Sequence, residues 1–206
     1  MSLFRTVAAS ALVLTLAAAV PARAQLITNP AEVQAGTYAI EPSHARVLFT
    51  VEHLGFSTWY GDFTGAKGVL VLDPKDPSKS SVDVSVPTAS VSTTNAVLDG
   101  ELKSADWFDA AKYPTISFKS TKVTVTGPGR AAVEGDLTLH GVTKPVTLTA
   151  TFKAAGVNGM NKHYTAGFDV SGKIKRSDFG VSKYVTFGLG DEVTLIISAP
   201  FERKDG

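Results

Sequence analysis

The chain has 206 residues, a formal net charge of +1 and no cysteine, and 44% of its residues are hydrophobic. This near balance of charge gives no reason to expect nucleic acid or an anionic membrane surface as a partner. The absence of cysteine excludes thiol catalysis, thiolate metal sites and disulfides, and a core of this size can do without disulfides.

The first 24 residues are predicted to be a cleaved secretory signal peptide. Arg5 supplies a positive charge, and the apolar stretch from Val7 to Val20 is too short to span a bilayer comfortably. Ala22-Arg23-Ala24 matches the A-x-A cleavage pattern. We therefore expect residues 25–206 to be exported as a single domain. An uncleaved N-terminal anchor is the alternative.

After a short arm at residues 26–36, the pattern predicts β-strands. In Arg46–His53, one face holds Val47, Phe49 and Val51, and the other holds Leu48, Thr50 and Glu52. Gly68–Leu72 is apolar on both sides. The alternation recurs in Ser81–Val86, Ile116/Phe118, Val123/Val125, Leu137/Leu139, Val146–Phe152, Ala166–Val170 and Val193–Ile197. About eight strands with short Gly- and Pro-containing turns predict an antiparallel sheet, closed into a barrel or folded as a sandwich.

One segment, Thr94–Lys112, has helical spacing instead. Gly100 and Ser104 weaken the pattern, which therefore predicts short helices. Trp107 and Phe108 near its end must be buried, and we expect them to cap a mouth of the barrel.

Residues with catalytic or metal-binding chemistry are sparse. The four histidines, His44, His53, His140 and His163, lack metal-ligand spacing, and a site assembled from distant strands is the remaining possibility. Ser43 and His44 are adjacent and point to opposite faces of a strand, so they cannot form a dyad directly. Acidic residues around the helical segment are interpreted as a solvated face, and Arg176-Ser177-Asp178 as an ion-paired turn. We therefore predict no catalytic residues and no metal site.

The chain is rich in aromatic residues, with 11 Phe and 2 Trp. An eight-stranded barrel is just wide enough for side chains to fill it or for one small ligand to enter. The pattern does not choose between a filled and a hollow barrel.

Several motifs resemble the YceI-like family of periplasmic polyisoprenoid-binding proteins. The matching segments are Tyr38-x-Ile40-Glu41-Pro42-x-His44 through Phe56, Gly61-x-Phe63, Leu102–Asp109 with Tyr113-Pro114, Gly135–Val146, Arg176–Gly180 and Asp191-Glu192-Val193. They cover nearly all of the chain after residue 37, in order and at the family's spacing.

The resemblance implies an all-β, extended, lipocalin-like antiparallel barrel of eight strands, with a short helical segment near one mouth. It also implies a periplasmic protein, often dimeric, that holds an isoprenoid lipid such as a quinone or polyprenyl precursor and has no catalytic cofactor. A membrane redox or lipid-handling protein is a possible partner. We predict that the lumen is lined by Val47, Phe49, Val51, Phe118, Leu137, Leu139 and Phe168. Residues predicted near a mouth are His44, His53, Trp59, Tyr60, Trp107 and Phe108.

The chain departs from the family pattern at one motif. Many members have Arg-Asp-x-His-Leu where this chain has Leu98-Asp99-Gly100-Glu101-Leu102. Two potentially cationic positions are thus apolar and acidic here. If they meet the ligand's head group, a pyrophosphate is disfavoured and a neutral quinone-like head is favoured.

A non-catalytic carrier of an isoprenoid lipid is therefore the expected function. Two alternatives stay open. An enzyme acting on an isoprenoid would need a polar pair converging in the lumen, with His44 or His53 as a member. A structural or interaction module would have a filled barrel and a protein partner.

Overall fold

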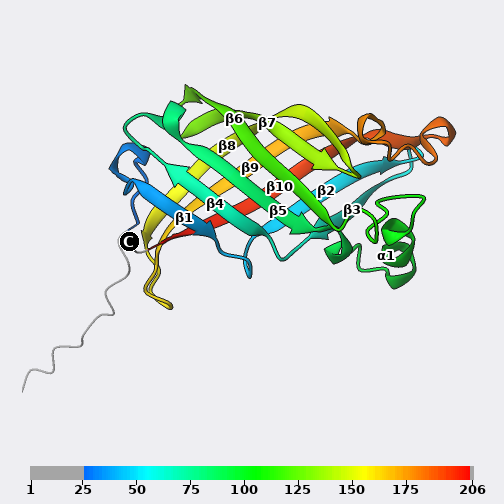
Figure 1. Cartoon of the computed structure of the whole chain (residues 1–206), viewed down its shortest axis with the longest axis horizontal. Coiled ribbons are helices and arrows are strands. Elements are labelled where there is room, and N and C mark those ends of the chain that lie inside the picture. The colour runs from blue at the N-terminus through cyan, green and yellow to red at the C-terminus, as the bar shows by residue number, and fades with distance from the viewer. Residues whose placement is uncertain (1–25, 205–206) are drawn as a thin grey trace, which may run out of the picture.

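The structure is a computed structural model that describes residues 26–204. The predicted signal peptide, residues 1–24, lies outside the described residues. One sheet of ten strands dominates the fold (Figure 1). The strands are β1 (Gly36–Ile40), β2 (Arg46–His53), β3 (Ser57–Phe63), β4 (Lys67–Leu72), β5 (Ser81–Pro87), β6 (Thr115–Gly127), β7 (Arg130–Leu139), β8 (Val142–Val157), β9 (Tyr164–Lys175) and β10 (Leu189–Arg203).

The sheet closes because β10 pairs with two short strands along one edge. Its first part pairs with β2, from Leu189 to Ser198, and its last part pairs with β1, from Phe201 to Arg203. β1 and β2 thus act as one interrupted strand, and β4 and β3, which pair with them, act as the next. With β5 to β10 this gives a closed antiparallel barrel of eight strands, which confirms the barrel prediction and excludes the sandwich.

Register explains which side chains point inward. Directly opposite residues of antiparallel strands share one face of the sheet. One such row crosses six strands through Val47, Ile197, Val170, Ala150, Ala131 and Val125. Once one member of the row faces the lumen, the pairing places all six there.

The helical segment lies at one end of the barrel (Figure 1). Helix α1 (Ala96–Lys103) is capped at its N-terminus by Asn95, whose side chain accepts hydrogen bonds from the backbone N–H groups of Val97 and Leu98. Turns follow it, and Trp107 and Phe108 pack with Phe63 in a core cluster at this end. The prediction of a short helical segment near one mouth is confirmed.

The same end holds the loops that follow β9. These contain the 3₁₀ helices η4 (Arg176–Phe179) and η5 (Val185–Phe187). The opposite end holds η1 (Pro30–Glu32) and the turn between β6 and β7 (Figure 1). The other 3₁₀ helices are η2 (Pro77–Lys79) and η3 (Thr88–Ser90). No helix within residues 26–204 is long and apolar enough to cross a membrane.

Candidate functional site

The barrel encloses a cavity of about 820 Å³ that runs along its length. Its wall includes Pro30 and Gly129 at the η1 end and Leu98 and Tyr184 at the α1 end. This volume lies within the range of about 300–1,000 Å³ that is usual for small-molecule sites. A single cavity therefore connects the two ends of the barrel.

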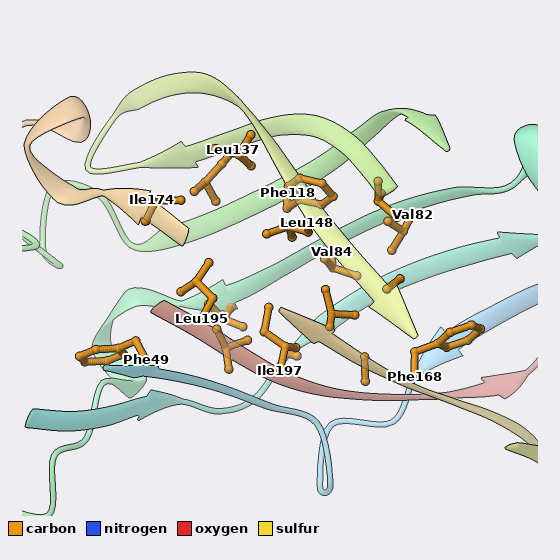
Figure 2. Close-up of a pocket in the computed structure, with 18 of the residues that line it drawn as sticks. Phe49, Val82, Val84, Phe118, Leu137, Leu148, Phe168, Ile174, Leu195 and Ile197 are labelled. Carbon is orange, nitrogen blue, oxygen red and sulfur yellow. The ribbon is translucent and has the colours of Figure 1, made fainter. Parts of the chain in front are cut away.

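The wall of the cavity is almost wholly apolar. Figure 2 shows side chains from strands all around the barrel pointing toward one another, and they contain only carbon. The labelled members are Phe49, Val82, Val84, Phe118, Leu137, Leu148, Phe168, Ile174, Leu195 and Ile197. Because the wall is mostly hydrocarbon, the cavity suits an apolar ligand.

The barrel is hollow rather than filled. Several inward-facing side chains, including Phe49, Val51 and Val170, keep part of their surface accessible although they point away from the outer solvent. In a filled barrel, close packing would remove that surface. The aromatic residues therefore line the wall instead of meeting at the centre.

Glycines in the strands let large side chains lie against the wall. A Cβ added at Gly61 would come within 2.4 Å of the Phe49 ring, which lies across the strand pair from it. Gly135 stands in the same relation to Phe118, and Gly172 to Leu148. Glycine permits such close approaches, which leave the axis of the barrel open.

All seven residues predicted to line the lumen lie on the cavity wall. That they contact a ligand stays a prediction. Six further residues that the sequence pattern did not assign to the lumen also line it: Val82, Val84, Leu148, Ile174, Leu195 and Ile197. Their alternation was visible, but only the strand register links it to the face that holds Val47.

The predicted mouth residues divide into two groups. His53, Trp59, Tyr60, Trp107 and Phe108 line the cavity, and the rings of His53 and Trp59 are 5.5 Å apart. His44 lies outside it, in the turn between β1 and β2, where its side chain is 83% exposed and contacts Glu41. The structure therefore does not bring His44 and His53 together in the lumen.

Two basic side chains beside Trp107 at the α1 mouth are already occupied. Arg176 is buried and donates hydrogen bonds to the backbone carbonyls of Gly190, Val181, Lys183 and Leu189 at 2.8–3.2 Å. The Nζ atom of Lys183 lies 2.8 Å from Asp106 and 4.0 Å from Glu101. Neither cation is left free for an anionic ligand.

The prediction of an ion-paired turn at Arg176-Ser177-Asp178 is wrong, because the Arg176 guanidinium donates to backbone carbonyls instead of a carboxylate. Asp191 on β10, rather than Asp178, accepts hydrogen bonds from the backbone N–H and the hydroxyl of Ser177. Burial raises the pKa of Asp191, but these hydrogen bonds and the nearby Arg176 outweigh it, so the pKa is lowered overall. Burial also lowers the pKa of Arg176, against the effect of Asp191. These groups fasten η4 to β10.

One buried donor at this mouth has no acceptor. Nε1 of Trp107 makes no hydrogen bond within residues 26–204, although buried indole N–H groups usually have a partner.

Among residues 26–204, no group of three or more His, Asp or Glu side chains is placed to hold a metal ion.

Comparison with known proteins identifies the family. The model of the YceI-like domain matches residues 38–201. The chain belongs to the YceI-like family. A relative from Serratia proteamaculans, named a UPF0312 protein, is 42% identical over 178 residues, covering 84% of this chain and 90% of the relative. Protein YceI of Escherichia coli O157:H7 is 41% identical over 177 residues, covering 85% and 91%.

Solved structures share the fold of this YceI-like chain. A Campylobacter jejuni YceI protein matches with a TM-score of 0.65 and 31% identity, covering 75% of this chain and 90% of that one. Burkholderia cenocepacia BcnA matches with a TM-score of 0.71 and 24% identity, covering 78% and 98%. A polyisoprenoid binding domain from Saccharophagus degradans matches with a TM-score of 0.61 and 14% identity, covering 83% and 100%.

Proposed function

We propose that this protein is an exported, non-catalytic carrier that holds a long isoprenoid lipid, a quinone or a polyprenyl precursor, inside the barrel. The observation that supports this most directly is the continuous apolar cavity of about 820 Å³. Burying a hydrocarbon chain is favourable by about 0.8 kcal/mol for each CH₂ group. An apolar tunnel of this kind keeps such a chain out of water.

Two comparisons support the ligand class. The chain shares its family with the YceI proteins, and its fold with a domain described as polyisoprenoid-binding. The leader-like residues 1–24 support export to the periplasm. The catalytic alternative needs a polar pair in the lumen. His44 lies outside the cavity, and His53, which lines it, has the Trp59 ring as its neighbour at 5.5 Å, so there is no His44–His53 pair to support it.

We place the head group at the α1 mouth and propose that it is uncharged. Leu98 and Glu101, the two positions that depart from the family pattern, both line the cavity there. Arg176 and Lys183 are occupied by protein acceptors, so a diphosphate would meet the Glu101 carboxylate without a free cation beside it. A quinone carbonyl also offers an acceptor to the unpaired N–H of Trp107.

Native mass spectrometry of the protein from a periplasmic extract tests the proposal. Solvent extraction and mass analysis then identify any bound molecule, and the native spectrum reports whether two copies associate. We expect a stoichiometric isoprenoid. An empty protein that also fails to take up added quinones would contradict the carrier function.

Adjacent residues on β10 provide a matched pair of variants. Ile197 lines the cavity, whereas Ile196 is half exposed on the outer face. Ile197→Trp should block the lumen and abolish ligand retention, and Ile196→Trp should leave it unchanged. Equal retention by the two variants would place the ligand elsewhere.

A further inference from the structure

An exposed apolar cluster lies beside the α1 mouth of the barrel. It consists of Leu54, Phe56, Tyr184 and Phe187, which we call the mouth patch. Phe56 is 89% exposed and Phe187 is 76% exposed, while Leu54 and Tyr184 are about half exposed. Clusters of this kind on a protein surface usually mark a binding surface.

The mouth patch joins two loops that are distant in sequence. Leu54 and Phe56 lie at the tip of the β2–β3 hairpin, whereas Tyr184 precedes η5 and Phe187 is its last residue. A Cβ added at Gly188 would lie 3.4 Å from the Leu54 side chain, so the two loops lie close together, and the rings of Tyr184 and Phe187 are 6.2 Å apart. Figure 1 shows both loops at the end of the barrel that also holds α1.

Two residues of the mouth patch have a strained backbone conformation with positive φ. Leu54 and Gly55 have positive φ angles of 57° and 73°, and the N–H of Phe56 bonds to the carbonyl of His53 at 3.0 Å. Asn-Gly is the preferred pair for such a turn, because Asn tolerates positive φ better than Leu. Tyr184 is also held at a positive φ, of 61°. Two bulky apolar residues thus occupy strained, exposed positions, which points to a role for their side chains.

The mouth patch is continuous with the cavity. Tyr184 lines the cavity itself, and its ring packs against that of Trp107 at 6.1 Å. His53 and Leu189, which adjoin the two loops, also line it. An apolar molecule leaving the lumen here would move from one hydrocarbon surface to the next.

The size and charge of the mouth patch favour a bilayer over a protein partner. From the usual areas of aromatic side chains, the four residues expose roughly 500 Å², less than the ~800 Å² that each partner of a stable dimer buries. Lys183 beside Tyr184 is paired with Asp106, and residues 26–204 contain equal numbers of basic and acidic side chains. Attraction to anionic lipid therefore contributes little, and insertion of apolar side chains would drive binding.

We propose that the mouth patch inserts into the interfacial region of a lipid bilayer, so that the cavity opens directly onto the membrane. This adds a docking surface to the proposed function, and its test does not require the carrier function to be correct. Exposed apolar groups also lie at the opposite end, where Met160 is 94% exposed on the β8–β9 hairpin. Because no residue of that hairpin tip lines the cavity, Met160 serves as the control.

Co-sedimentation with phosphatidylcholine vesicles tests the inference. The processed protein is compared with the Phe56→Ser/Phe187→Ser double variant and with Met160→Ser, all with the same N-terminus checked by intact mass. We expect the double variant to have an affinity for the vesicles that is lower by about tenfold or more. Met160→Ser should bind like the unmodified protein. Binding should persist between 0.1 and 0.5 M salt, because screening affects charges and not apolar insertion.

Three binding outcomes would overturn the inference. They are no binding to phosphatidylcholine vesicles, equal binding by the protein and the double variant, and binding that needs anionic lipid and is lost at 0.5 M salt. Light scattering tests whether the mouth patch instead joins two copies of the chain. If the double variant had half the mass of the unmodified protein, the mouth patch would be a dimer interface and the inference would be overturned. Circular dichroism checks that the variants fold. Ligand content by native mass spectrometry reports on the carrier function separately.

Discussion

At the scale of single residues, the open cavity depends on glycines that lie beneath the side chains of its wall. Gly61→Ala would place a Cβ 2.4 Å from the Phe49 ring. We expect the ring to turn toward the lumen, at a cost of about 1–3 kcal/mol in unfolding free energy, with reduced ligand uptake. Urea denaturation and native mass spectrometry measure the two effects.

Gly100 in α1 provides the control, since an added Cβ there meets nothing within 4 Å. Gly100→Ala should stabilise the protein by up to about 1 kcal/mol, as alanine favours a helix interior. If both alanine variants changed stability alike, contact with Phe49 would not be the reason for glycine at position 61.

The proposed preference for an uncharged head group also depends on single residues, Leu98 and Glu101. Placing cations at the mouth by Leu98→Arg/Glu101→His should raise the relative affinity for a polyprenyl diphosphate over a quinone with the same chain, since opposite charges then meet at the cavity wall. Competition binding measures this ratio. An unchanged ratio would remove the proposed role of Leu98 and Glu101. Arg130, which lines the cavity at the opposite end, would then be the position to substitute.

At the scale of elements, the fastening of η4 to β10 predicts a pH dependence. Asp191 has a lowered pKa in the folded protein, so its contribution to stability is present above the unfolded pKa of about 3.9 and is lost as the pH falls through the folded value. Asp191→Asn should therefore destabilise by about 1 kcal/mol at pH 7, and by less at pH 3. Urea denaturation at both pH values measures the difference.

The position of η4 explains why this fastening matters for the site. Arg176 in η4 donates to carbonyls of the loop that leads to Tyr184 and of the start of β10. The same segments line the α1 mouth. A destabilising effect of Asp191→Asn that stayed constant from pH 7 to pH 3 would contradict the assignment of its carboxylate to this contact.

At the scale of the whole molecule, the hollow barrel predicts stabilisation by ligand. A ligand that binds only the folded state adds about 2.7 kcal/mol at a free concentration 100 times its Kd. Protein stripped of lipid should therefore unfold at a lower temperature than loaded protein, and re-addition of a quinone should restore the Tm. Calorimetry measures this, with Ile197→Trp as a variant whose Tm should not respond. Identical Tm values for stripped and loaded protein would argue against binding in the lumen.

Much of the architecture could be predicted from the sequence because it depends on local periodicity. Alternation in segments such as Arg46–His53 predicted strands. The weakened helical spacing of Thr94–Lys112 predicted short helices, where the structure has α1 followed by turns, and Leu102–Asp109 contributed to the family resemblance. The face that holds Val47, Phe49 and Val51 was visible as one apolar set. These properties are local, since each depends on residues only a few positions apart.

Tertiary structure decided what depends on pairing between distant segments. Strand register joins Val47 to Ile197 and Val170, and it thereby assigns the whole row to the lumen, which a slip of one residue would reverse. The pairing of β10 with both β1 and β2 closes the sheet into a barrel, which the sequence pattern could not distinguish from a sandwich. The close approach of the Phe49 ring to Gly61 helps to keep the barrel hollow, because the ring lies against the wall. Composition alone is equally compatible with a ring at the centre of the barrel.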